Sequence, residues 1–568
     1  MRCRICAGTL NLAIRGREQT WSADVFAPSF HRPAEHDDLF RCDDCGAVQQ
    51  PSLPRGQHLH ELYQEMYDVL YLAEEEGRRR TARRILGLLG PPLRGGRLLD
   101  VGCGHGLLLD EARRIGYRVE GLELSREAAR HARNQLGLFV REATLDDMSL
   151  DEERFDVIVL ADVLEHLDDP VGALGRCSQL LASGGALVVA TPDPSSLTAR
   201  LAGRRWWGYV PAHHCLIPRV TLRELIAGQG LVIERDIALK RSFSFGYWLA
   251  GLIERARAHG RIAAALARRV PRQRIVTLSL GDERLTVARK VEVLEPSRPR
   301  VVDRHASAQV HVVLPAYHAE QTVSEVAAAI PVEAVDRALL VDDASSDDTV
   351  ERALASGLAV LRHPANRGYG ANQKTCYVRA AREGADIVVM LHADNQYDAA
   401  FVAEMVKPIE DGIADVVIGS RLLQDEAIAG GMPRWKWIGN RGLTRVGNRA
   451  FRRNFSEYHT GYRAFSVPFL RTIPFLRNSD GFVFDQEIFA QVITREARIV
   501  ELPIPTRYFL EASSVSFARS VEYGLRTLLV LARFRLDETR CRWLLLRRPA
   551  VTLARDPKDE ALPVPVGR

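Results

Sequence analysis

The sequence predicts a multidomain α/β protein, and three observations support that class. The chain has 568 residues, which is too long for one hydrophobic core. Two long stretches alternate short apolar runs with amphipathic runs, a pattern typical of parallel sheets covered by helices. Two pairs of cysteines stand before the first stretch. The expected divisions are a small four-cysteine module at 1–60, an α/β domain at 61–240, a helical segment and linker at 241–308, a second α/β domain at 309–540 and a flexible tail at 541–568.

The composition is that of a globular protein and excludes several classes of function. Hydrophobic residues make up 46% of the chain and charged residues 26%, which are ordinary values. The net charge of +5 is small for this length, so no nucleic-acid partner is expected. No apolar run approaches the ~20 residues of a spanning helix, and the chain shows no secretory signal. A cytoplasmic protein is therefore expected.

The two cysteine pairs, Cys3 with Cys6 and Cys42 with Cys45, have the spacing of zinc ligands. Two such hairpins can wrap one tetrahedral Zn²⁺ through four thiolates. Because cysteine fills all four positions, no coordination site stays open, and the zinc is predicted to be structural. A redox pair and unrelated thiols are the alternatives.

The first α/β stretch begins with a strand that runs into a glycine-rich turn. The turn contains Gly102, Gly104 and Gly106, and the carboxylate of Glu123 ends the next expected strand. Glycines let a backbone approach a ligand closely, and a carboxylate about twenty residues on can bind ribose hydroxyls. This is the arrangement of a nucleotide-binding βαβ unit. Strands are expected at 97–101, 118–123, 138–141, 155–160 and 186–191, and helices at 106–115, 125–136 and 170–182.

Three carboxylates favour S-adenosylmethionine as the nucleotide at this turn. Asp100 closes the first strand, where it could meet the amino group of a methionine moiety. Asp146 follows the third strand and could hold adenine, and Asp162 ends the fourth strand. Together with the later Gly184-Gly185 block, these features resemble class I S-adenosylmethionine-dependent methyltransferases over residues 80–240. The resemblance implies a Rossmann-like, seven-stranded sheet and cofactor contacts from Asp100, Gly102, Gly104, Gly106, Glu123, Asp146 and Asp162.

The four-cysteine module has a further resemblance, and the glycine turn permits an alternative cofactor. The module looks like the zinc-binding N-terminus found on a subset of sugar and small-molecule C-methyltransferases. Glu123 would also permit a nicotinamide-linked oxidoreductase, which the blocks around Asp162 and Gly184 do not favour.

A candidate substrate lid at 206–214 combines aromatic residues with His213 and His214. In a methylation that removes a proton, either histidine could act as the general base because its pKa lies near neutral pH. His166 is a further candidate. A structural histidine in the interior is the alternative for each.

The second α/β stretch ends its strands in polar residues. Asp342 and Asp343 follow the second strand, and His392, Asp394 and Gln396 follow the fourth. Oxygen ligands at strand ends suit Mg²⁺ or Mn²⁺, which would neutralise a leaving nucleoside diphosphate. Strands are expected at 310–314, 337–342, 358–362, 386–391 and 415–418, and helices at 320–329, 346–355, 368–382 and 398–411.

These motifs, together with 419–421, 459–465 and 484–487, resemble family 2 glycosyltransferases of the GT-A fold. The resemblance covers about 310–515 and is closest to the branch of dolichol-phosphate-mannose and polyprenyl-phosphate-glycosyl synthases. It implies nucleotide-sugar contacts from Pro315, Tyr317, Asp342, Asp343 and Arg421, a metal held by His392, Asp394 and Gln396, and a catalytic Asp485 near the acceptor.

The second domain also departs from its family and carries further basic residues. The family usually has an acidic residue where this chain has His392, and neutral histidine can still bind Mn²⁺. Arg463 and Arg507 would join Arg421 in binding phosphate of the donor or the acceptor. The stretch from Arg519 to Arg535 is amphipathic. It could lie on the inner face of an anionic membrane, or it could be a terminal helix that covers the domain core.

The sequence therefore predicts a bifunctional enzyme. One domain would transfer methyl groups from S-adenosylmethionine to a sugar, small molecule or glycolipid. The other would transfer a sugar, with inversion, from a nucleotide sugar to a polyprenyl phosphate, a glycan or a related acceptor. The alternative from another class is that one of the two domains is a non-catalytic binding or scaffold module.

Overall fold

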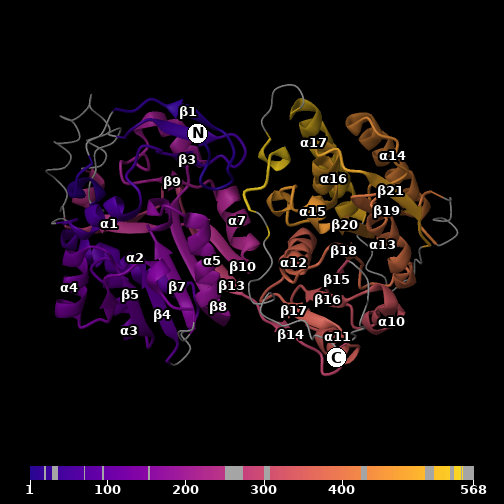
Figure 1. The fold of residues 1–568 in the computed structure, drawn as a ribbon, viewed down its shortest axis with the longest axis horizontal. Helices are drawn as coiled ribbons and strands as arrows, with labels where there is room; N and C mark the ends of the chain where they lie inside the picture. Colours follow the sequence, from indigo (N-terminus) through magenta and orange to yellow (C-terminus); the bar gives the residue numbers. More distant parts are fainter. Residues whose placement is uncertain are drawn as a thin grey trace, which may run out of the picture. The chain divides into compact units, whose positions relative to one another are not determined.

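The computed structural model describes most of the chain, and Figure 1 follows it by colour from indigo to yellow. The chain divides into two compact units, Met1–Lys290 and Val291–Arg568. Each unit is built on a mixed α/β sheet, so the predicted multidomain α/β class is confirmed. The described residues are 1–17, 21–27, 36–68, 71–91, 95–150, 154–249, 273–299, 308–423, 431–505, 517–537, 543–551 and 553.

The first unit is organised around a 7-stranded sheet of order β10-β13-β8-β7-β4-β5-β6. The strands from β6 to β8 run parallel, whereas β13 is antiparallel to both neighbours. Parallel strands are buried on both faces, which accounts for the almost uninterrupted apolar runs in β7 and β8. The bounds are β4 (Arg97–Val101), β5 (Arg118–Leu122), β6 (Val140–Arg141), β7 (Phe155–Ala161), β8 (Leu181–Pro192), β10 (Leu231–Ala238) and β13 (Glu283–Lys290).

Helices connect these strands, and their ends follow from local sequence. Ser125 caps the start of α4 (Arg126–Leu136) by accepting a hydrogen bond from the backbone N–H of Ala128. Gly137 ends this helix in a left-handed conformation, as is usual at helix ends. The helices of this unit are α1 (Gly56–Gln64), α2 (Glu75–Gly87), α3 (Leu107–Arg114), α4 (Arg126–Leu136), α5 (Pro170–Leu180), α6 (Leu197–Ala202) and α7 (Arg219–Gly228).

The cysteine-rich module forms a 4-stranded sheet of order β1-β2-β3-β9. Its last strand comes from a distant part of the chain, because β9 (Cys215–Leu216) pairs with β3 (Val48–Gln49). Figure 1 shows β9 beside β3 near the N-terminus. The module therefore shares a sheet with the segment that follows the expected substrate lid. Its first strands are β1 (Leu10–Ile14) and β2 (Leu39–Cys42).

The segment 241–308 differs from the expected helical segment and linker. Residues 245–249 are helical, but four strands occupy other described parts of it. In β13, Arg284 and Arg289 pair with acidic residues of the neighbouring β10, Asp236 and Glu234. These cross-strand pairs lie far apart in sequence, so the arginine-rich pattern alone gives no sign of a strand. The strands are β11 (Arg241–Ser244), β12 (Ile275–Leu278), β13 and β14 (Val293–Leu294).

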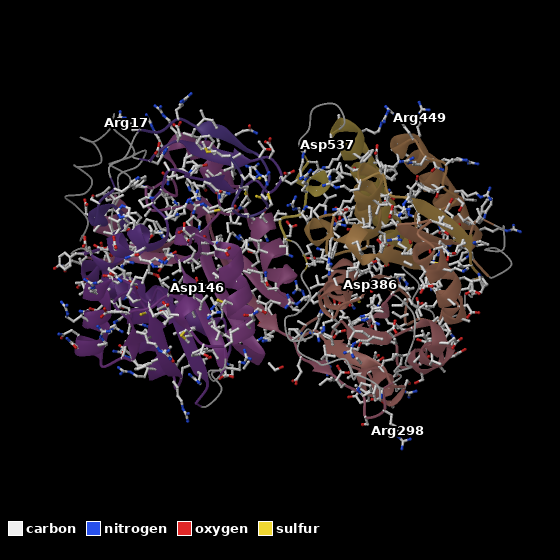
Figure 2. All side chains as sticks on the ribbon, viewed as in Figure 1. Arg17, Asp146, Arg298, Asp386, Arg449 and Asp537 are labelled. Atoms are coloured by element: carbon white, nitrogen blue, oxygen red, sulfur yellow. The ribbon has the colours of Figure 1, made fainter. Side chains whose placement is uncertain are left out.

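The second unit contains an 8-stranded sheet of order β14-β17-β16-β15-β18-β20-β19-β21. The strands β17, β16, β15 and β18 run parallel, so their carboxyl ends and the motifs that follow them meet at one edge. Charged side chains such as Arg298 and Arg449 are exposed at the surface of this unit, as Figure 2 shows. The bounds are β15 (Val310–Ala316), β16 (Arg337–Asp342), β17 (Ala359–Arg362), β18 (Ile387–Met390), β19 (Val416–Ser420), β20 (Arg463–Ser466) and β21 (Ile499–Pro503).

Two long helices at the end of this unit pack against each other, α14 (Arg434–Phe451) and α17 (Phe517–Asp537). The side chains of Phe451 and Phe534 meet edge to face across them. In the described part of the chain, no helix is both long enough and apolar enough to cross a bilayer. The remaining helices are α10 (Val323–Ala329), α11 (Thr349–Ala355), α12 (Tyr369–Arg382), α13 (Val402–Glu410), α15 (Val467–Leu470) and α16 (Phe484–Thr494).

Candidate active sites

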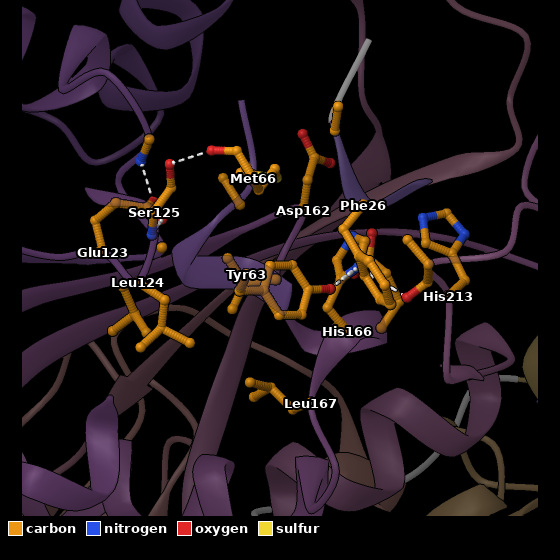
Figure 3. Close-up of a pocket in the computed structure, with 18 of the residues that line it drawn as sticks. Phe26, Tyr63, Met66, Glu123, Leu124, Ser125, Asp162, His166, Leu167 and His213 are labelled. Atoms are coloured by element: carbon orange, nitrogen blue, oxygen red, sulfur yellow. Dashed lines mark hydrogen bonds between the residues drawn. The ribbon is translucent and has the colours of Figure 1, made fainter. Parts of the chain in front are cut away.

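A cavity of about 650 Å³ opens in the first unit. It extends from the glycine turn, with Gly102 and Gly104, to the lid residues Trp207 and His213. In Figure 3, Glu123 and Ser125 lie on one side of the view and His166 and His213 on the other. The cavity therefore joins the predicted cofactor end to the predicted substrate end in one space.

The glycine turn is shaped for close approach of a ligand and for tight packing. All three glycines have left-handed φ angles, 66° at Gly102, 54° at Gly104 and 82° at Gly106. A Cβ at Gly106 would lie 2.6 Å from the side chain of Leu138, so this glycine serves helix packing and does not line the cavity. The carboxylate of Glu123 accepts hydrogen bonds from the backbone N–H of Gly104 and of Ser125, each at 2.7 Å. Glu123 thus fixes the turn while its side chain also lines the cavity.

The three aspartates of the predicted cofactor site lie in different environments. Asp100 is buried beneath the turn and is not part of the cavity lining. Burial and the nearby Glu123 raise its pKa well above the ordinary value. Asp146 is exposed and lines the cavity. Asp162 has a left-handed φ of 60° and forms an ion pair with Arg241 at the cavity.

Two histidines and a glutamate form the wall opposite the glycine turn. The Nδ1 atom of His166 lies 3.0 Å from the carbonyl of Ala212, and Nδ1 of His213 lies 2.7 Å from the carbonyl of Gly208. Because a carbonyl only accepts, each Nδ1 carries the proton and each Nε2 keeps its lone pair. One ligand atom from each of Glu165, His166 and His213 lies within 4.8 Å of the other two.

Burial keeps all three groups of this wall uncharged at neutral pH. It lowers the pKa of His166 to about 4 and of His213 to about 3. It also raises the pKa of Glu165, near Asp162, to about 8. The Glu165 side chain accepts a hydrogen bond from Thr191 at 2.9 Å. Both imidazoles are therefore neutral and can accept a hydrogen bond at Nε2, although the lowered pKa values make each a weaker base than an ordinary histidine.

His214 lies outside the cavity lining, unlike His213. Its side chain is fully buried, and its Nδ1 lies 3.1 Å from the guanidinium of Arg4. Of the two histidines singled out in the sequence, only His213 faces the site.

Sequence reasoning missed several residues that line the cavity. Arg241 donates to Glu283 at 2.9 Å, and both come from strands beyond the predicted domain end at 240. Tyr63 contacts His166 Nδ1 at 2.9 Å through its hydroxyl, and Tyr71 stacks on His105. No local pattern marks these residues, because distant strands and helices bring them to the site.

The four cysteines gather as the spacing predicts. Their sulfur atoms all lie within 4.8 Å of one another, with Cys3 to Cys45 at 3.5 Å and Cys6 to Cys42 at 3.4 Å. These separations are too long for disulfide bonds and close to those between ligands on one tetrahedral zinc. The backbone N–H of Ile5 donates to Cys3 Sγ. The arrangement fits a Zn²⁺ ion held by four thiolates.

In the second unit, Asp342 and Asp343 at the end of β16 have different hydrogen-bond partners. Asp342 Oδ2 accepts from the backbone of Ser345 at 3.0 Å, while its buried Oδ1 has no hydrogen-bond partner among the described residues. Asp343 accepts from the backbone N–H of Arg367 and Gly368 and faces His363 at 2.8 Å. Asp343 therefore builds the loop at 363–368, and Asp342 offers a free acceptor for a ligand.

The metal motif and the predicted base are joined by one tyrosine. The hydroxyl of Tyr369 lies 3.1 Å from His392 Nε2 and donates to Asp485 Oδ2 at 3.2 Å. Asp485 Oδ1 accepts from Gln373 at 3.0 Å and from Arg463 at 2.9 Å. With its hydroxyl proton on Asp485, Tyr369 accepts from His392 Nε2, which leaves the lone pair of Nδ1 available to a ligand.

The other predicted metal ligands lie beside this histidine. Asp394 is half-buried and accepts from the backbone of Gln396 at 3.2 Å. Asn395 between them has a left-handed φ of 58°, so the backbone turns sharply at the motif. The site offers one imidazole, one carboxylate and one amide, a set that suits Mn²⁺ or Mg²⁺.

The remaining predicted contacts are placed as follows. Arg421 is buried against Glu457, whose carboxylate accepts from its Nε at 3.0 Å, so the positive charge is already paired. Tyr317 follows Pro315 at the end of β15 and is half-exposed, with its ring stacked on His318 at 4.1 Å. Arg507 lies outside the described residues.

Comparison with known proteins agrees with the two sites. Residues 73–235 match a family described as a methyltransferase domain, and residues 311–473 match glycosyl transferase family 2. The ubiquinone biosynthesis O-methyltransferase of Cereibacter sphaeroides strain ATCC 17025 is 38% identical over 122 residues, which is 20% of this chain and 49% of that protein. An uncharacterized protein of Methanocaldococcus jannaschii is 30% identical over 200 residues, which is 35% of this chain and 82% of that protein.

Solved structures also match parts of the chain at low identity. Glucosyl-3-phosphoglycerate synthase from Mycobacterium tuberculosis, in complex with Mn²⁺, uridine diphosphate and phosphoglyceric acid, is 20% identical with a TM-score of 0.33 over 40% of this chain and 79% of that chain. A putative methyltransferase from Bacillus halodurans is 15% identical with a TM-score of 0.28 over 37% of this chain and 98% of that chain. The chain spans about half the length of the ubiquinone methyltransferases it matches, 49% for the first of them.

Residues 73–235 therefore carry a methyltransferase domain and residues 311–473 a family 2 glycosyl transferase domain.

Proposed function

We propose that the first unit transfers the methyl group of S-adenosylmethionine to a sugar or a related small molecule or glycolipid bound at the His166–His213 wall. The observation that carries this proposal is the single cavity that joins the glycine turn to that wall. S-adenosylmethionine supplies an electrophilic methyl group when it is bound. Gly102, Gly104 and Glu123 would hold its nucleoside and methionine parts, and Asp146 its adenine.

The residues of the wall prepare the acceptor for attack. His213 keeps its Nε2 lone pair because Gly208 holds the proton at Nδ1. It would accept the proton of the acceptor at Nε2 as the acceptor is methylated. Trp207, whose indole N–H donates to Asp282 at 2.6 Å, would close the same side of the cavity against water.

A thermal-shift experiment on the full chain tests the nucleotide at this site. S-adenosylhomocysteine should raise the melting temperature of the protein, because a ligand that binds only the native state stabilises it. NAD should leave the melting temperature unchanged. A shift with NAD and none with S-adenosylhomocysteine would support a nicotinamide-linked oxidoreductase instead.

We infer that the second unit transfers a sugar from a nucleotide sugar, with metal dependence and inversion. The free Oδ1 of Asp342 carries this inference, because a buried acceptor without a partner is costly unless a ligand donor reaches it. It would accept from the base of the nucleotide. His392, Asp394 and Gln396 would hold Mg²⁺ or Mn²⁺, which neutralises the leaving diphosphate when it is bound.

The contacts of Asp485 favour a phosphate acceptor over a hydroxyl acceptor. Arg463, Gln373 and Tyr369 all donate to its carboxylate, so both of its oxygens already have partners within the protein. A polyprenyl phosphate is already ionised at neutral pH and needs no base. Asp485 would then act by holding Arg463 and Tyr369 in place beside the donor.

Substitution of Asp394 by alanine tests the metal site. The variant should lose metal-dependent turnover of nucleotide sugars in a panel assayed with Mn²⁺. Turnover equal to that of the wild type would refute the assignment of this motif.

A further inference from the structure

The turn that carries His213 is held from outside by one side chain. Gln50 is buried, and its side-chain N–H groups face three carbonyls of this turn: Val210 at 2.8 Å, Pro211 at 3.2 Å and His213 at 2.9 Å. Its backbone N–H also donates to the carbonyl of His214 at 3.2 Å. Within the turn, the backbone N–H of His213 makes a long bond to Val210 at 3.3 Å, and its Nδ1 bonds to the carbonyl of Gly208 at 2.7 Å. Gln50 adds three contacts to carbonyls of this turn from outside it.

The residue next to Gln50 contacts the cysteine cluster. Gln49 donates from Nε2 to Cys3 Sγ at 2.9 Å and accepts from the backbone of Arg4 at 3.2 Å. Successive side chains along an extended chain point to opposite sides. Gln49 and Gln50 thus connect the thiolate cluster on one side with the His213 turn on the other.

Three further contacts connect the cysteine module to other parts of the first unit. Arg4, which lies inside the first cysteine pair, donates to Asp168 at 2.9 Å, and Asp168 lines the cavity. Thr221 donates to the carbonyl of Cys45 at 2.6 Å. Strand β9 pairs with β3 of the module. The contacts involve both cysteine pairs, so the wall of the cavity rests on the module as a whole.

We propose that Gln50 is a positioning residue for methyl transfer, through which the zinc-bound four-cysteine module sets the place of His213. Loss of zinc, or of the Gln50 donors, releases the 208–214 turn and disables the acceptor wall. The cofactor end of the cavity, built by residues 102–146, keeps its structure. The inference rests on the proposed methyl transfer of the first unit and extends it to a dependence on metal occupancy at a separate site.

Hydrogen exchange on the full chain tests this dependence. Gln50→Leu removes the donors at nearly constant volume, so three carbonyls of the turn lose their partner. The turn should then open more often, and the amide hydrogens of the peptide 206–216 should exchange at least ~10-fold faster than in the wild type. Peptides over 100–125 and over the second unit should be unchanged. Gln57→Leu is the matched control, because Gln57 is exposed and, among the described residues, its side chain bonds only to Glu61; it should change nothing.

A spectroscopic readout separates positioning from simple packing. In protein labelled at histidine, the ring signal of His213, assigned with His213→Gln, should move in Gln50→Leu because the Nδ1 bond to Gly208 is lost. The signal should stay in place in Gln57→Leu. If Gln50→Leu binds zinc and keeps both the His213 signal and the protection of 206–216, Gln50 does not position the turn and the proposal is wrong.

Zinc removal from the wild-type chain gives a second arm that needs no variant. Treatment with a thiol-binding mercurial and a chelator should expose 206–216 to exchange. Removal of the mercurial with excess free thiol, followed by added Zn²⁺, should restore its protection. Faster hydrogen exchange confined to residues 1–50, or a chain that binds no Zn²⁺, would overturn the proposed coupling between zinc binding and the 208–214 turn. S-adenosylhomocysteine binding is measured in parallel: its absence in the wild type refutes the proposed methyl transfer, whereas its presence with an unmoved turn refutes only the coupling.

Discussion

At the scale of single residues, the methyl-transfer site is distinguished by buried groups that are uncharged at neutral pH. Glu165 has a pKa raised by burial to about 8, and His213 has one lowered by burial to about 3. An uncharged imidazole with a fixed tautomer offers one lone pair for a hydrogen bond, although its lowered pKa makes it a weak base. The uncharged carboxyl beside it adds no negative charge to this wall, and the nearby charges are those of the Asp162–Arg241 ion pair.

His213→Gln tests the base assignment. The substitution keeps a polar side chain of similar size but removes the basic nitrogen. Methyl transfer should fall ~10²–10⁴-fold, the usual contribution of a general base, while binding of S-adenosylhomocysteine stays within about 2-fold. The rate is measured as S-adenosylhomocysteine formed with an acceptor that the wild type turns over. His214→Gln is the control at a histidine outside the cavity, and equal losses in both variants would contradict the assignment.

The stability of the first unit should depend on pH through Glu165. Its folded-state pKa of about 8 lies above the ordinary 4.5, so the folded state binds more protons than the unfolded state between these values. The Glu165 contribution to the free energy of unfolding therefore falls as pH rises from about 5 to 8. Glu165→Gln should remove this fall. Near pH 8 the free energy of unfolding of the variant should therefore exceed that of the wild type by a few kcal/mol, about 1.4 per pKa unit. Melting curves at several pH values measure the difference, and parallel pH profiles would contradict it.

At the scale of elements, α17 bears on the two alternatives that the sequence left open for residues 519–535, a membrane-surface helix and a helix that covers the domain core. Thr527, Val530, Leu531 and Phe534 are buried in the unit, so the helix covers its core. Leu525 and Leu529 are exposed at 65% and 53%. The described part of the helix is therefore both a cover and a carrier of exposed apolar side chains, which are the groups that enter a membrane interface.

Vesicle binding tests that exposed face. The double variant Leu525→Glu and Leu529→Glu should lower binding to vesicles of anionic phospholipid at least ~10-fold, because it places charge where apolar contact is needed. The double variant Leu197→Glu and Leu201→Glu is matched in chemistry, since both leucines are highly exposed on α6 of the first unit. It should bind as the wild type does. Equal binding by both double variants would exclude this face as a membrane contact.

Some elements could be predicted from the local sequence and others could not. The strands around 97–101 and 337–342 were predictable because their apolar runs end in glycine or carboxylate motifs that local chemistry explains. β13 and Arg241 were not, because β13 is held by cross-strand pairs and Arg241 by ion pairs far apart in sequence. The role of Gln50 could not be predicted either, because nothing near it in the sequence points to the carbonyls at 210–213.

At the scale of the whole molecule, each unit has its own sheet and its own hydrophobic core. The residues proposed for methyl transfer all lie before 290, and those proposed for glycosyl transfer all lie after 310. A unit with a complete core can bind and react without the other. The chain is therefore expected to hold two activities that mutations can separate, and neither unit requires the role of a scaffold.

Calorimetry of the full chain should reveal this independence. S-adenosylhomocysteine at about 100 times its Kd adds about 2.7 kcal/mol to the stability of the unit that binds it, which corresponds to a shift of roughly 5 °C for a domain of this size. Only one of two unfolding transitions should move. UDP-glucose with Mn²⁺, or another nucleotide sugar that binds, should move the other, and Asp394→Ala should abolish that second shift while leaving the first. A single transition that both ligands raise would show that the units unfold together, and independent activity would then have to be abandoned.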